Sequence, residues 1–199
     1  MRLLAHLGVD VNKRDDFGRT PLMNCALVDD DRWGVGLART LLEHGARSAP
    51  RDRVGLTALH YACIHRRPAL VSVLAAADFD VRTVDRRGNS SLHYAAATGD
   101  SAVTAALLAV YRRYRLPVNA VNRSGQTALE FARHNEHMDC VRMIRDVEEA
   151  VRYESSNEPR PPAHINEDDT ETTFRRTSDN LHEGMPYMTI QSNIRLIEN

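Results

Sequence analysis

The sequence contains the stretch Thr57-Ala58-Leu59-His60-Tyr61-Ala62, and a near copy, Ser90-Ser91-Leu92-His93-Tyr94-Ala95, begins 33 residues later. Weaker copies open at Thr20 and Thr127, each 37 residues from the neighbouring opening. A 33-residue period with two four-residue insertions indicates a row of similar units rather than one closed globular core.

Each unit is predicted to hold two helices. Thr57 is placed to cap the first helix, and Leu59 and Ala62 lie three residues apart on its buried side. Apolar residues then recur at helical spacing in the second part of each unit, which predicts a second amphipathic helix. These residues are Leu70, Val71 and Leu74, then Val103, Leu107 and Leu108, then Val141 and Ile144. One unit cannot cover such faces alone, so neighbouring units are expected to stack and share an elongated core.

A glycine stands two residues before each opening hydroxyl residue, where a tight turn is expected to need positive φ. These glycines are Gly18, Gly55, Gly88 and Gly125. With these copies in register, residues 3–150 resemble the ankyrin repeat, a finger turn followed by two antiparallel helices. The resemblance implies an all-α solenoid of stacked helix-turn-helix units with finger turns. It also implies an adaptor or regulatory role through binding to other proteins.

Composition divides the chain into two parts. Residues 1–154 are predicted to form the repeat domain, with a partial first repeat at 1–15, about four repeats and a closing helix. Leu3, Leu4 and Leu7 would leave an apolar edge at the start, which favours a shortened sequence over an edge covered by something else. From Ser155 onward, polar residues and prolines dominate, so residues 155–199 are expected to form a disordered acidic tail.

The two insertions supply candidate binding residues. The first is expected in a loop at residues 28–36, between the two helices of the first full unit, and contains the only tryptophan, Trp33. That indole is either an interface anchor or a cover that folds back on the first repeat. The second insertion is expected to lengthen a helix after Leu108, with Tyr111 and Tyr114 on neighbouring sides. The two tyrosines are either a second binding patch or part of a plain surface helix.

The charge of the chain is unevenly distributed. The net charge is −1, but residues 155–199 contain four Arg and eight Asp or Glu, which leaves the repeats at +3. Basic residues precede the finger glycines, with Arg14 and Arg51 nearby, so stacking should align them along one edge. The candidate binding residues in this row are Arg53, Arg86, Arg87 and Arg123. The alternative is an ordinary solvated edge.

Histidines and cysteines favour structural roles. His60 and His93 are expected to bond to the backbone of the neighbouring finger, as the family resemblance implies. His134, His137 and Cys140 step by three along a helix, but a metal site is not favoured because a fourth ligand is absent. Glu136 departs from the family's turn glycine, so positive φ there would add strain. The three cysteines, Cys25, Cys63 and Cys140, are expected to be reduced core residues.

Neither a catalytic site nor a cofactor site is predicted. The sequence lacks a Gly-rich phosphate loop, a G-x-S-x-G turn and a Cys-x-x-Cys pair. In the tail, Arg175-Arg176-Thr177-Ser178 matches the spacing read by basophilic kinases, with Ser178 as the acceptor. The tail is expected to fold back on the arginine row and compete with an acidic partner, more strongly when Ser178 is phosphorylated. Deletion of residues 155–199 should then raise partner affinity.

The sequence therefore predicts a non-enzymatic scaffold or adaptor that binds a partner protein through the concave face and finger edge of the stack. The partner is expected to be acidic, the chain monomeric and without a membrane span, and its location the cytoplasm, the nucleus or both. The alternative function is binding of a polyanion, nucleic acid or acidic lipid, through the arginine row. The small positive charge of the repeats and the opposing charge of the tail disfavour that alternative.

Overall fold

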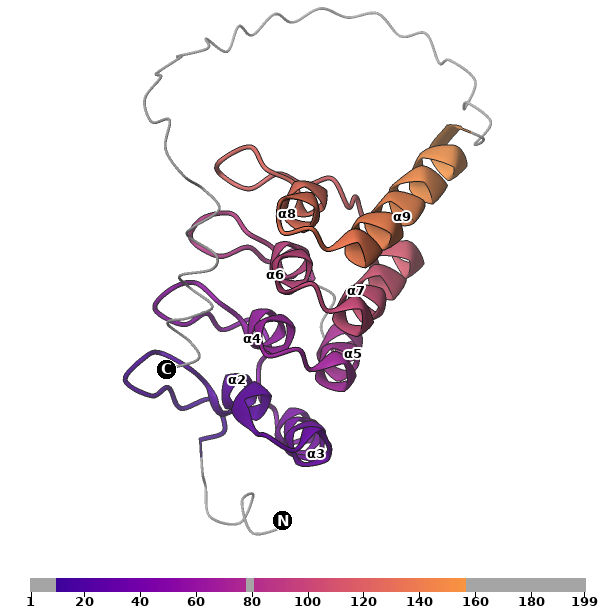
Figure 1. Cartoon of the computed structure of the whole chain (residues 1–199). Coiled ribbons are helices and arrows are strands. Elements are labelled where there is room, and N and C mark those ends of the chain that lie inside the picture. Colours follow the sequence, from indigo (N-terminus) through magenta and orange to yellow (C-terminus); the bar gives the residue numbers. More distant parts are fainter. Residues whose placement is uncertain (1–9, 78–80, 157–199) are drawn as a thin grey trace, which may run out of the picture.

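The computed structural model describes residues 10–77 and 81–156, which form four stacked helical units (Figure 1). The first unit contains the short helix α2 (Pro21–Asn24), the 3₁₀ turn η1 (Cys25–Leu27) and α3 (Asp31–Glu43). The other three units are helix pairs. They are α4 (Ala58–Ile64) with α5 (Pro68–Ala77), α6 (Ser91–Thr98) with α7 (Ser101–Arg113), and α8 (Ala128–His134) with α9 (Met138–Ser156).

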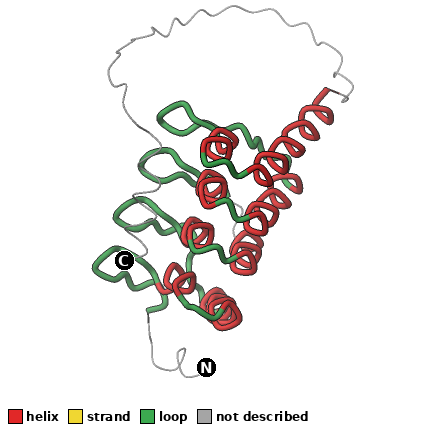
Figure 2. The backbone as a smooth tube through the Cα atoms, viewed as in Figure 1, coloured by secondary structure: helices red, strands yellow, loops and turns green. Residues whose placement is uncertain are grey.

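The helices form two rows, and the fingers project to one side of them. First helices α2, α4, α6 and α8 lie in one row and second helices α3, α5, α7 and α9 in the other (Figure 1). Contacts run between successive members of each row, such as α4 with α6 and α5 with α7. The finger loops extend from the first-helix row, away from the second helices (Figure 2). The predicted all-α solenoid is therefore confirmed.

The core follows the apolar periodicity. The expected second-helix residues are buried, from Leu70, Val71 and Leu74 through Val103, Leu107 and Leu108 to Val141 and Ile144. All three cysteines are free thiols in this core. Leu92 is 1% exposed, whereas its counterpart Leu59 is only partly buried, so the expectation for Leu59 holds in part.

Backbone geometry at the turns agrees with the sequence. Gly18, Gly55, Gly88 and Gly125 all have positive φ, between 75° and 97°. Glu136 also adopts positive φ, at 59°, as expected for a residue in place of the turn glycine. The cost of a side chain in this region is about 1–2 kcal/mol. The stack accepts that cost at three non-glycine positions among the described residues, the others being Arg66 and Arg115.

The expected location of the first insertion is wrong. Each second helix begins eleven residues after the opening hydroxyl residue, from Thr20 to Asp31 as from Thr57 to Pro68. The additional residues therefore lie after the start of α3, which has 13 residues against 10 in α5. Helix α7 also has 13 residues, so the predicted lengthening after Leu108 is confirmed. Both insertions mainly extend a second helix.

Residues 31–36 are helical rather than a loop because α3 is capped at its first turn. The Asp30 carboxylate accepts hydrogen bonds from the backbone N–H groups of Arg32 and Trp33, at 2.8 and 3.2 Å. Gly34, which resembled a loop residue, allows close packing instead. A Cβ atom there would lie 2.8 Å from the carbonyl oxygen of Cys25.

Candidate protein-interaction surface

Each finger is closed by one acidic or amide side chain at its base. Oδ1 of Asp52 accepts hydrogen bonds from the backbone N–H groups of Val54 and Leu56, at 2.9 and 2.8 Å. Asp85 and Asn122 accept the equivalent pairs in the next two fingers. This side-chain acceptor turns the chain back on itself and fixes the shape of the finger.

Tyrosines tie the finger bases to the first helices. The Tyr61 hydroxyl donates to Oδ2 of Asp52 at 2.9 Å, and the Tyr94 hydroxyl donates to Oδ2 of Asp85 at 2.7 Å. Burial and the adjacent Asp52 carboxylate raise the pKa of Tyr61, so it stays a neutral donor. Both oxygens of Asp52 and of Asp85 are thus engaged inside the fold.

Adjacent fingers nest on their glycines. A Cβ atom on Gly55 would lie 2.8 Å from the backbone nitrogen of Arg86, and one on Gly88 would lie 2.8 Å from that of Arg123. Backbone hydrogen bonds also join the fingers, as from the Arg123 N–H to the Arg87 carbonyl at 3.0 Å. The backbones of Arg86 and Arg123 are therefore held in equivalent positions on their fingers.

This nesting aligns three of the four predicted arginines, Arg53, Arg86 and Arg123, all of them exposed. We refer to these three residues as the arginine column. Arg87, also exposed, lies one residue further along its finger. In the first finger the column position, two residues before Gly18, is occupied by the exposed Asp16, which the sequence analysis did not single out. Its position relative to Gly18 would have revealed it.

Two neighbouring arginines have a structural role instead. Nη1 of Arg14 donates to the carbonyl oxygen of Arg51 at 2.7 Å, and Nη1 of Arg51 donates to that of Val84 at 2.8 Å. Each guanidinium group thus binds the next finger. Arg14 and Arg51 fasten the edge, whereas the arginine column faces solvent.

The repeated histidines connect consecutive units, as predicted. Nδ1 of His60 accepts from the Thr57 backbone N–H at 3.2 Å, while Nε2 donates to the Asn89 carbonyl at 3.3 Å. His93 repeats this pattern with Ser90 and the Gln126 carbonyl. Burial lowers the pKa of His60 to about 4, and it also lowers that of His93. Both rings are neutral structural bridges.

The aromatic candidates differ in accessibility. Trp33 is 64% exposed in the first turn of α3, so it does not fold back as a cover, and its role as an anchor stays a prediction. The surface position expected for Tyr111 is wrong, since that ring is 3% exposed on the buried face of α7. Burial raises its pKa to about 12. Tyr114, three residues on, is partly exposed beneath the Arg113 guanidinium group.

The three residues considered as metal ligands, His134, His137 and Cys140, do not share a common site. Nε2 of His137 is 3.1 Å from the Ala97 carbonyl, and the buried Sγ of Cys140 is 3.4 Å from Oγ1 of Thr104. His134 is exposed. Within residues 10–77 and 81–156, no group of three or more His, Cys, Asp or Glu side chains is arranged to hold a metal ion. Ser178 lies outside the described residues.

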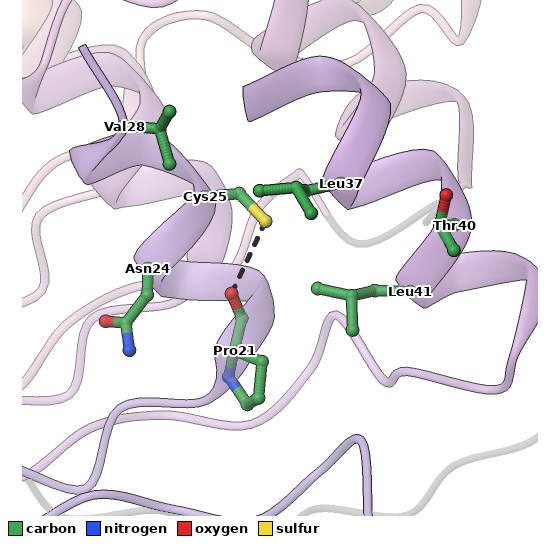
Figure 3. Close-up of a pocket in the computed structure, with 7 residues that line it drawn as sticks. All are labelled: Pro21, Asn24, Cys25, Val28, Leu37, Thr40 and Leu41. Carbon is green, nitrogen blue, oxygen red and sulfur yellow. Dashed lines mark hydrogen bonds between the residues drawn. The ribbon is translucent and has the colours of Figure 1, made fainter. Parts of the chain in front are cut away.

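A hollow of about 460 Å³ opens in the first unit (Figure 3). Its wall is mostly apolar and is formed by Pro21, Asn24, Cys25, Val28, Leu37, Thr40 and Leu41. Asn24 occupies the position of Tyr61, Tyr94 and Phe131 in the later units, so this unit has a small polar side chain where the others have an aromatic ring. Oδ1 of Asn24 has no hydrogen-bond partner among the described residues.

Comparisons with known proteins agree with this architecture. Two family models match, one for ankyrin repeats in three copies at residues 1–85 and one for ankyrin repeats in many copies at residues 74–132. The chain is 35% identical over 156 residues to "Ankyrin repeat domain-containing protein 63" of Homo sapiens, which covers 76% of this chain and 41% of that protein. The Mus musculus protein of that name is 37% identical over 134 residues, 67% of this chain and 34% of its own length.

A further relative is "Ankyrin repeat and LEM domain-containing protein 1 homolog" of Caenorhabditis elegans, 36% identical over 57% of this chain and 15% of that protein. The chain thus spans about two fifths or less of these relatives. Ankyrin repeats generally mediate protein–protein interactions and are generally not enzymes. Among the described helices, none combines the length and apolar character needed to cross a membrane. Its stacked finger-and-helix-pair units and these matches make the chain a member of the ankyrin-repeat family.

Proposed function

We propose that this chain is a scaffold or adaptor that binds an acidic segment of a partner protein along its finger edge and the adjoining concave face. The observation behind the proposal is the arginine column. Arg53, Arg86 and Arg123 are exposed on nested fingers, and no described carboxylate forms an ion pair with them. Uncompensated charges held on a rigid edge favour association with an oppositely charged surface.

A protein partner fits this edge better than a nucleic acid does. Nucleic-acid binding commonly uses about 6–10 phosphate contacts, and the column supplies three guanidinium groups. Asp16 occupies the equivalent position in the first finger and would repel a phosphate backbone that extended beyond Arg53. A short acidic peptide segment can end before that position, so the pattern of charge suits a protein.

The proposal is tested by affinity purification with the complete chain as bait. In the test variant, Arg53, Arg86 and Arg123 are each replaced by Glu, which reverses the column while the backbone contacts of the fingers remain. We expect partners captured by the wild type to be reduced at least about tenfold. That factor corresponds to about 1.4 kcal/mol spread over three exposed pairs.

The matched control carries the same change in charge elsewhere. Arg39, Arg112 and Arg145 are exposed on the second-helix row, and replacement of these three by Glu should leave capture unchanged. Equal loss in both variants would mean that net charge alone governs binding. Retention of every partner by the column variant would refute the proposed edge.

Two further features belong to the proposal and concern the whole chain. Residues 155–199 compete with the partner for the arginine column, more strongly when Ser178 is phosphorylated, and the protein acts as a monomer in the cytoplasm or nucleus. The competition is inferred from the charge of residues 155–199 and from the phosphorylation motif around Ser178. Trp33 is a second candidate contact because an exposed indole often anchors an interface.

A further inference from the structure

The three side chains of the arginine column leave their fingers in one direction. Measured from the Cβ position that an alanine would have at the preceding finger's glycine, the Cγ atoms of Arg53, Arg86 and Arg123 lie at 3.4, 3.1 and 3.2 Å. The corresponding backbone nitrogens lie at 3.2, 2.8 and 2.8 Å. The column is therefore a repeated geometry, with one arginine in each of the last three units.

The acidic groups nearest in sequence form no ion pair with the arginine column. Asp52 and Asp85 directly precede Arg53 and Arg86, but their oxygens already accept backbone N–H groups and a tyrosine hydroxyl. Asn122, which precedes Arg123, is uncharged. The fold thus uses its acids internally and leaves the arginine side of each finger to an external anion.

The spacing of the column selects a backbone conformation in the ligand. Stacked helices lie about 8–10 Å apart, and each unit contributes one finger, so successive arginines are separated by a similar step. A polyproline II helix rises about 3.1 Å per residue with three residues per turn, which places every third side chain on one side at about 9 Å. In a β-strand, by contrast, residues three apart point to opposite faces.

We infer, on the basis of the function proposed above, that the arginine column recognises an acidic polyproline II segment with a carboxylate at every third residue. Three carboxylates match Arg53, Arg86 and Arg123 in turn. Asp16 then limits the site at its first finger, because a fourth carboxylate in register would meet a like charge. Recognition depends on the spacing of charge along the segment and not only on its amount.

The inference is tested with two fluorescent peptides of identical composition and the complete chain. One contains three consecutive Glu-Pro-Pro units, and the other contains three adjacent Glu residues followed by six Pro. Fluorescence anisotropy at low ionic strength should show about tenfold tighter binding of the spaced peptide. Arg86→Glu should remove this preference, whereas Arg39→Glu on α3 should retain it.

A gain-of-function variant tests the limit set by Asp16. Asp16→Arg extends the column to four arginines, so a peptide of four Glu-Pro-Pro units should bind about threefold tighter to this variant than to the wild type. The peptide of three units should change less. This comparison does not require any partner to be known, and it keeps the inference testable if a charge-reversed variant folds poorly.

Equal affinity for the spaced and clustered peptides would overturn the inference, and so would the absence of binding to either. A single-stranded oligonucleotide that bound more tightly than the spaced peptide would also overturn it, in favour of a polyanion site. If partner capture depends on the arginine column while the peptides are not discriminated, the proposed function stands and only the spacing rule fails.

Discussion

At the scale of single residues, equivalent positions in successive units differ in how deeply they are buried. Leu92 on α6 is 1% exposed, whereas Leu59 on α4 is only partly buried. The sequence presents the two leucines in nearly identical surroundings, Ala58-Leu59-His60 and Ser91-Leu92-His93. The local pattern therefore does not determine how deeply each leucine is buried.

Replacement of each leucine by alanine should reveal this difference in stability. Leu92→Ala removes a fully buried side chain and should cost about 2–5 kcal/mol of unfolding free energy. Leu59→Ala removes fewer buried contacts and should cost about half as much or less. Urea unfolding followed by circular dichroism measures both values. A loss at Leu59 equal to that at Leu92 would contradict the burial in the structure.

The residue pattern predicted the recurring structural histidines but not the burial of Tyr111. The bridging role of His60 and His93 was predictable because both recur in register with their capping hydroxyl residues. Tyr111 was not, since two tyrosines three apart on a helix give no indication of which one faces the core. The apolar residues Leu107 and Leu108 beside it were the available signal for the buried face of α7.

At the scale of elements, the fingers owe their stacking to glycine for two separable reasons. Gly88 has φ of 82° and a neighbouring backbone nitrogen at 2.8 Å from its Cβ position. Gly125 has φ of 75° but nothing within 4 Å of its Cβ position, because it belongs to the last finger of the described residues. Gly36 in α3 has neither constraint. The three positions form a graded series in which strain and crowding can be measured apart.

Alanine at these three positions should give three different changes in unfolding free energy. Gly36→Ala should stabilise by up to about 1 kcal/mol through helix propensity. Gly125→Ala should destabilise by about 1–2 kcal/mol through the left-handed backbone alone. Gly88→Ala should cost more than Gly125→Ala, because a backbone atom of the next finger must move as well. Thermal or urea unfolding would refute this explanation of nesting if Gly88→Ala and Gly125→Ala proved equal.

The insertions show that the spacing between repeat openings predicts the size of an insertion but not its location. The separation of 37 residues between Thr20 and Thr57 gives the size of the first insertion but not the segment that absorbs it. The acidic, glycine-containing residues near Trp33 suggested a loop, yet Asp30 caps a helix at that point. Because the second helix always begins at one offset from the opening residue, the added turn appears at its far end.

At the scale of the whole molecule, the histidine bridges between neighbouring units make the stability of the stack depend on pH. The pKa of buried His60 is about 4 in the folded chain, against an ordinary value of 6.5. Below pH 6.5 the unfolded chain takes up a proton that the folded chain does not, so stability falls as the pH falls towards 4. Above pH 6.5 both states are neutral at this group, and its contribution is constant.

The predicted loss between pH 6.5 and pH 4 is on the order of 3 kcal/mol for His60, and the lowered pKa of His93 adds to it. Urea unfolding across this range measures the slope. His60→Gln should flatten the pH dependence, while His44→Gln, at the exposed C-cap of α3, should leave it unchanged. Parallel slopes in all three proteins would show that acid sensitivity arises elsewhere.

The main-chain contacts between fingers have a consequence for how binding specificity can change. Backbone bonds such as that from Arg53 to Phe17, at 3.1 Å, set the distance between neighbouring fingers, so the guanidinium groups themselves are dispensable for the scaffold. Substitution at positions 53, 86 and 123 can therefore change the charge presented by each finger to positive, neutral or negative. The distance between neighbouring fingers stays the same. The same framework can accommodate a different ligand without any rearrangement of its helices.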